Sequence, residues 1–169
     1  MKKIDFYLKK GQIIKDETII PLAKKYLAKA RNNLTTMETL SNLNHKKESL
    51  PLDYDPNEWV VITGYYAMYS AALALVAKLG YKSKNHSATI LILEEFFVKK
   101  KELDEASVNL LKNAKIRKQE IDELAEARHK REIAQYSITK ETTKEIAEKI
   151  KKDAYDFVNK TEELIKETI

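Results

Sequence analysis

Apolar residues recur every three or four positions along most of the chain, which is the spacing of one face of an α-helix. The pattern predicts five helices, at about residues 18–41, 56–79, 86–98, 104–136 and 139–169. The 56–79 segment is apolar on both sides, so we expect other helices to surround it. Residues 42–55 have no periodicity and collect Asn, Ser, Pro and Asp, which predicts a long connection.

Helix start and stop signals support this division. Asp55, Pro56 and Glu58 combine a capping carboxylate, a proline at the first helical position and an acid in the first turn, and Gly80 supplies the matching stop. The chain has only 3 Gly and 3 Pro in 169 residues, a composition typical of long helices. We therefore predict an all-α domain over residues 18–169, preceded by an N-terminal arm over residues 1–17, with no internal repeat.

Composition narrows the kind of site to expect. The absence of cysteine excludes disulfides and thiolate metal sites, and the three histidines have no metal-ligand spacing, so we expect no metal and no cofactor. We find no signal-peptide pattern and expect no segment apolar for long enough to span a bilayer, which favours a soluble, cytoplasmic protein without membrane contact. A net charge of +5 is compatible with an acidic partner such as RNA but does not require one.

One face of the helix predicted over residues 104–136 is apolar at first and polar in its last turns. Its apolar positions are Leu110, Ala114, Ile121, Leu124 and Ala125, and the same face then carries Arg128, Arg131, Glu132, Gln135 and Tyr136, with Arg117 also on it. An unpartnered guanidinium is costly to bury, so these arginines must pair internally, face a cleft or lie at an interface. Alternatively, the helix leaves the bundle after Ala125 and its last turns are solvated, with Glu132 pairing with Arg128.

Several short motifs, in this order along the chain, resemble those of the HEPN domain family. They are Tyr65-Tyr66-Ala67-Met68-Tyr69 with Ala71 and Ala72, then Gly80, Lys84 and His86, and later Arg131-Glu132-Ile133-Ala134-Gln135-Tyr136. The likeness covers roughly residues 20–165. It implies an up-and-down bundle of about five helices that often forms a homodimer, with the arginine motifs of two subunits in one cleft. Family members bind or cleave RNA or bind nucleotides, and several are toxins beside a minimal nucleotidyltransferase antitoxin.

The sequence departs from the ribonuclease members of that family, in which four to six residues separate the arginine from the histidine that follows it. The corresponding positions here are Ile133, Ala134 and Gln135 after Arg128, and Tyr136, Ser137 and Ile138 after Arg131. Metal-free RNA cleavage needs a group that accepts a proton near neutral pH, which a Tyr with a pKa of about 10 does not do. His129 lies about 100° around the helix from Arg128 and is a poor substitute. This departure favours binding over cleavage.

The candidate residues each have a structural alternative. Arg131 can hold a phosphate with two hydrogen bonds or form a structural ion pair, and Tyr136 can stack on a base or cap the core. His86 can assist a bound phosphate or make hydrogen bonds at its helix N-terminus. A core role is favoured for Tyr65, Tyr66 and Tyr69. The basic residues Lys99, Lys100, Lys101, Lys112, Lys115, Arg117 and Lys118 form either a surface for a nucleic-acid backbone or a solvated face.

We therefore predict a homodimeric HEPN-like protein with a ligand-binding or dimer cleft. The cleft residues are Arg128, Arg131, Gln135, Tyr136 and His86. This cleft is predicted to bind RNA or a nucleotide, or to dock a nucleotidyltransferase partner. The alternative is a metal-independent ribonuclease that uses a non-standard group, such as His86 or His129 of the other subunit.

Overall fold

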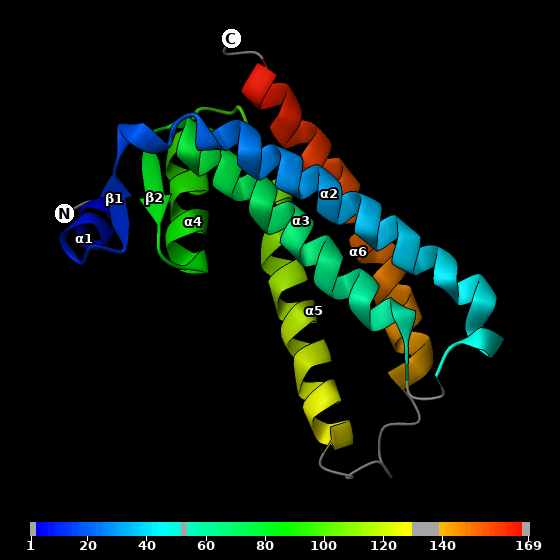
Figure 1. The fold of residues 1–169 in the computed structure, drawn as a ribbon. Helices are drawn as coiled ribbons and strands as arrows, with labels where there is room; N and C mark the ends of the chain where they lie inside the picture. The colour runs from blue at the N-terminus through cyan, green and yellow to red at the C-terminus, as the bar shows by residue number, and fades with distance from the viewer. Residues whose placement is uncertain (1–2, 52–53, 130–138, 167–169) are drawn as a thin grey trace.

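The computed structural model describes residues 3–51, 54–129 and 139–166, and these ranges are largely helical (Figure 1). Their six α-helices are α1 (Lys3–Lys9), α2 (Leu22–Asn42), α3 (Pro56–Lys78), α4 (His86–Leu93), α5 (Glu105–His129) and α6 (Thr139–Lys166). The two strands are β1 (Ile13–Lys15) and β2 (Tyr81–Ser83). Turns of 3-10 helix occupy Glu17–Ile19 and Leu43–Ser49, and a π-helical turn occupies Glu94–Val98. The predicted all-α helical bundle is confirmed.

The bundle is built around α3, which contacts α2, α4, α5 and α6. Helices α2 and α3 lie side by side, α6 packs against both, and α5 leans away from the others toward its C-terminal end (Figure 1). α3 starts where the sequence predicts, because Oδ1 of Asp55 accepts the backbone N–H of Asn57 at 3.0 Å and Pro56 occupies the first turn. It ends before Gly80, whose φ of 70° is a conformation that glycine adopts without strain.

Close packing between α3 and its neighbours depends on Gly64. A Cβ atom at this position would lie 2.5 Å from Cγ2 of Ile150 on α6 and 3.0 Å from Sδ of Met37 on α2. Three helices therefore meet at a point where only a hydrogen atom fits.

The apolar composition of α3 corrects one expectation. An 18-residue window of this helix has a mean hydropathy of 1.7, so by length and composition alone α3 could cross a membrane. The expectation that no segment reaches this length was wrong, because a helix with partners on nearly every side needs apolar residues all round. In the structure 72% of that window is buried against the rest of the chain, as expected for the core helix of a bundle.

The N-terminal arm contains structure that the sequence did not predict. β1 pairs antiparallel with β2, with Ile13 opposite Ser83 and Lys15 opposite Tyr81. Ile13 is buried in a small cluster with Ile4 of α1 and Ile92 of α4. The arm therefore attaches α1 to the side of the bundle where α4 lies (Figure 1).

The sequence identified only part of the buried face of α5. Ala114 and Ile121 are buried as predicted, together with Val108 and Leu111. Arg117 does not belong to this face, because it is exposed and makes an ion pair with Glu120 at 2.7 Å. An α-helix has 3.6 residues per turn, so positions seven residues apart are displaced by about 20° around the helix. The buried positions of α5 therefore shift gradually around the helix from one heptad to the next.

Candidate functional site

A polar pocket of about 290 Å³ lies where α3, α4 and α5 meet. Its lining residues are Tyr65, Tyr66, Tyr69, His86, Lys115, Lys118, Gln119 and Asp122. We call it the His86 pocket. The three helices contribute different chemistry, since α3 supplies aromatic rings, α4 supplies an imidazole and α5 supplies charged and amide side chains.

The tyrosines of α3 divide between the core and the pocket mouth. Tyr65 is only 2% exposed, and its ring is nearly parallel to that of Tyr69 one turn later, with centroids 6.0 Å apart. Tyr66 points about 100° away from Tyr65 on the helix and is 43% exposed. The predicted core role is therefore right for Tyr65 and wrong for Tyr66, whose ring is available to solvent or to a ligand.

His86 stands in the first turn of α4 and contacts the tyrosines of α3. Oδ1 of Asn85 caps this helix by accepting the backbone N–H of Ala88 at 2.8 Å, so His86 is not the capping residue. Instead, Oη of Tyr65 lies 2.8 Å from Nδ1 and 2.9 Å from Nε2 of His86. The imidazole centroid is 4.2 Å from that of the Tyr69 ring. These contacts fix the imidazole on the inner wall of the pocket.

The surroundings of His86 favour its neutral form. Partial burial, together with the positive charges of Lys115 and Lys118, lowers the pKa of His86 below its ordinary value of 6.5. Burial and the neighbouring Tyr69 and Tyr66 raise the pKa of Tyr65, which therefore stays protonated. The Tyr65 hydroxyl either donates to the bare nitrogen of the imidazole or accepts its N–H, according to the tautomer.

The outer wall of the pocket is the polar face of α5. Lys118 pairs with Asp122 one turn further along, and its Nζ lies 5.9 Å from the centroid of the Tyr66 ring. Lys115 makes no ion pair with any residue that the structure describes. One ammonium group is thus partly neutralised and the other is uncompensated, which gives the mouth of the pocket an excess of positive charge.

Of the predicted cleft residues, the structure places His86 in this pocket. Arg128 belongs to the last turn of α5, seven residues after the buried Ile121, but its side chain lies outside the described part of the chain. Arg131, Gln135 and Tyr136 also lie outside it. Arg128 thus follows, along the same helix, the middle turns of α5 that line the His86 pocket.

The sequence did not indicate the contribution of α5 to this pocket. Lys115 and Lys118 were predicted only as part of a basic surface or a solvated face, and Gln119 and Asp122 were not singled out. Their spacing does show a shared polar face of α5. The contribution of this face to the pocket depends on tertiary packing, because nothing in the sequence shows that the face lies opposite His86.

The chemistry of the His86 pocket suits a ligand with a negative charge and a planar group. Two ammonium groups can attract a phosphate or carboxylate, and the exposed ring of Tyr66 can stack on a flat surface. Among the side chains that the structure describes, which do not include those of His45, His129 and Glu141, no three His, Asp or Glu residues gather where they could hold a metal ion.

Comparisons with known proteins agree with this fold. A family profile described as HEPN domain matches residues 17–164, which is most of the chain. The UPF0332 protein of Archaeoglobus fulgidus is 34% identical over 103 residues, which cover 61% of this chain and 71% of that protein. No solved structure matches the chain significantly. The matched segment includes α2 to α5 and nearly all of α6, and on this evidence the chain belongs to the HEPN domain family.

Proposed function

We propose that this HEPN domain binds RNA or a nucleotide in the His86 pocket. The observation that carries the proposal is the position of Lys115 and Lys118 beside the exposed ring of Tyr66. A phosphate would lie against the two ammonium groups while a base stacks on Tyr66. His86 would donate or accept one hydrogen bond at the inner wall.

The arginines at the end of α5 would extend this binding surface. Arg128 and Arg131, with Gln135 and Tyr136 beyond them, continue along the chain from the α5 residues that line the pocket. In the homodimer that we infer from the family, the arginines of both subunits would meet in one cleft, which could also dock a small nucleotidyltransferase. Sedimentation velocity would test the dimer, and co-purification with a nucleotidyltransferase encoded by a neighbouring gene would test the partner.

Binding of fluorescently labelled single-stranded RNA at low salt tests the proposal. Replacing Lys115 and Lys118 together by Gln removes two cations from the pocket mouth. We expect weaker binding and a fall of about 0.7 in the slope of log affinity against log salt for each lost phosphate contact. The matched control is Lys25→Gln with Lys29→Gln, which removes the same charge from exposed positions of α2. An equal loss of RNA affinity in both double variants, or no loss in either, would reject the His86 pocket as the binding site.

A metal-independent ribonuclease is the second candidate, because the lowered pKa of His86 leaves a neutral imidazole at pH 7. Both ring nitrogens lie within 2.9 Å of Oη of Tyr65, so the imidazole would have to rotate before one nitrogen could take the proton of an RNA 2′-hydroxyl while the other kept its hydrogen bond to Tyr65. The 2′-oxygen would then form a bond to the phosphorus while the P–O5′ bond breaks, which gives a 2′,3′-cyclic phosphate and a 5′-hydroxyl that takes its proton from the imidazolium or from water. Cleavage of RNA in the presence of a chelator, abolished by His86→Gln, would establish this activity, and intact RNA after prolonged incubation would exclude it.

A further inference from the structure

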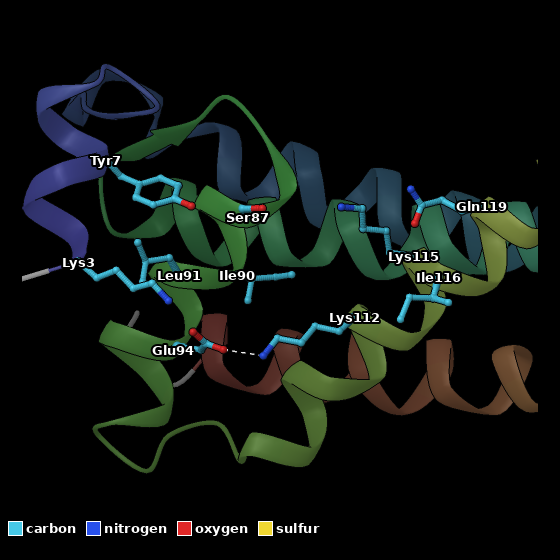
Figure 2. A pocket seen from close by; sticks show the side chains of 10 residues that line it. All are labelled: Lys3, Tyr7, Ser87, Ile90, Leu91, Glu94, Lys112, Lys115, Ile116 and Gln119. Atoms are coloured by element: carbon cyan, nitrogen blue, oxygen red, sulfur yellow. Dashed lines mark hydrogen bonds and ion pairs between the residues drawn. The ribbon is translucent and has the colours of Figure 1, made fainter.

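A second pocket, of about 440 Å³, adjoins the His86 pocket on the side of the N-terminal arm. Helix α1 contributes Lys3 and Tyr7, α4 contributes Ser87, and α5 contributes Lys112. Figure 2 shows these side chains around the opening, and we call it the α1 pocket. Lys115 and Gln119 line both pockets, so the two pockets are neighbours along α5.

The α1 pocket is positively charged. It contains three lysines and one acid, Glu94, and that carboxylate is engaged by Lys112 at 2.7 Å. Within the part of the chain that the structure describes, neither Lys3 nor Lys115 makes an ion pair. Figure 2 shows Lys3 and Lys115 on opposite sides of the pocket, with the ion pair of Lys112 and Glu94 joining α5 to the turn that follows α4. Two uncompensated cations thus remain at its two sides.

The lysines of α5 repeat at a regular interval along these two pockets. Lys112, Lys115 and Lys118 follow one another every three residues, a rise of about 4.5 Å per step along the helix axis. Lys112 lines the α1 pocket, Lys118 lines the His86 pocket, and Lys115 lines both. Successive lysines are also turned by about 60° around the helix. Because Lys112 pairs with Glu94 and Lys118 with Asp122, a phosphate chain along α5 would meet Lys115 directly and would replace these two carboxylates at the other lysines.

Each pocket also contains an aromatic ring. Tyr66 borders the His86 pocket, and Tyr7 of α1 borders the α1 pocket beside an apolar floor formed by Ile90 and Leu91. A basic groove with aromatic rings spaced along it is the usual design for single-stranded nucleic acid, because the cations follow the backbone and the rings stack on unpaired bases. A duplex keeps its bases stacked on one another and cannot offer them to either ring.

We propose that the two pockets form one groove for single-stranded RNA, in which α1 binds the nucleotides that continue beyond the His86 pocket. This inference rests on the proposed function, and it adds a defined second subsite and a preference for a continuous strand over a mononucleotide or a duplex. Lys3 would contact a phosphate and Tyr7 would stack on a base. The N-terminal arm is then part of the binding surface.

The test compares a dinucleotide, a single-stranded octanucleotide and the same octanucleotide as a duplex, by fluorescence anisotropy at low salt. We expect the single-stranded octanucleotide to bind most tightly. Tyr7→Ala should weaken its binding about tenfold, and Lys3→Gln should lower its salt slope by about 0.7, while neither changes the affinity for the dinucleotide. Lys9→Gln, an exposed lysine of α1 outside the pocket, is the matched control.

The outcomes separate this inference from the proposed function. If Lys3→Gln and Tyr7→Ala bind the octanucleotide like wild type while the Lys115 and Lys118 double variant has lost affinity, the α1 subsite is wrong and the His86 pocket stands. If wild type binds none of the three RNAs at low salt, both are wrong. If Tyr7→Ala detaches α1 from the bundle, circular dichroism will reveal the loss of helix. Lys3 is exposed, so Lys3→Gln leaves the packing of α1 intact and still tests the α1 pocket.

Discussion

The hydroxyl of Tyr65, in the middle of α3, lies 2.8 Å from Nδ1 of His86, in the first turn of α4. Tyr65 is 2% exposed, so this contact satisfies a polar group that the core has otherwise removed from water. The same contact holds the imidazole against the pocket wall. Stability and the geometry of the candidate site therefore depend on one pair of side chains.

Tyr65→Phe should reduce the free energy of unfolding by about 1 kcal/mol, because it removes the hydrogen bond to His86 while keeping the ring. Urea unfolding monitored by circular dichroism measures the change. Tyr69→Phe is the matched control, since its ring also packs on His86 but its hydroxyl has no hydrogen bond within the described part of the chain. Equal effects of the two substitutions would contradict a specific role for the Tyr65–His86 contact.

The lowered pKa of His86 predicts a pH dependence of stability. Burial and the charges of Lys115 and Lys118 make protonation harder in the folded state than in the unfolded chain. The unfolded state therefore binds more protons just below its own pKa of about 6.5. This contribution to stability is complete above that pH and is lost progressively as the pH falls toward the folded-state pKa. Urea unfolding at about pH 7.5 and about pH 5.5 should show a smaller decrease in His86→Gln than in wild type.

An NMR titration provides an independent check on that interpretation. The imidazole signal of His86 should titrate below 6.5 in wild type, and it should move upward when Lys115 and Lys118 are both replaced by Gln. An unchanged midpoint in the double variant would mean that the lysines do not influence the imidazole.

Gly64→Ala should destabilise the protein, although alanine is the better helix former. The gain in helix propensity is about 1 kcal/mol, whereas overpacking a well-filled core costs about 1–3 kcal/mol. The new Cβ would meet Cγ2 of Ile150 at 2.5 Å, so the steric cost should prevail. Ile150→Leu moves the branch away from that point, and in combination with Gly64→Ala it should recover part of the lost stability. Thermal unfolding of both single variants and the double variant gives the coupling energy.

The predicted arginine cleft has its own test. Replacing Arg128 and Arg131 by Gln should weaken binding of RNA or of a nucleotidyltransferase partner at low salt, because guanidinium groups hold phosphates and carboxylates with paired hydrogen bonds. The Lys25 and Lys29 double variant again controls for loss of charge alone. Unaltered binding of RNA, nucleotide and partner in the arginine variant would exclude a role for the cleft.

Local signals in the sequence were enough to predict the main helices. Asp55 and Pro56 start α3 and Gly80 follows its end because capping and backbone geometry act within a few residues. The β1–β2 pair was not predicted, since three-residue strands are too short to show an alternation of polar and apolar positions. Its partners are also far apart in the sequence, so only the folded chain brings them together.

The candidate site was predictable only in part, for the same reason. His86 was identified from its motif and its position at a helix start, but its partner Tyr65 and the lysines of α5 meet it only through tertiary packing. Tyr66 was placed in the core because a run of aromatic residues on an apolar helix usually lies there. Its exposure of 43% depends on tertiary packing, which the sequence does not encode locally.

NMR of the isotopically labelled protein can show whether RNA binds in the His86 pocket. On titration with single-stranded RNA, we expect the His86 imidazole signals and the amide signals of α5 around Lys115 and Lys118 to shift. The amide signals of α2 around Lys25 and Lys29 should not shift. If RNA binds and perturbs other surfaces while the His86 and α5 signals remain unchanged, the pocket is not the binding site.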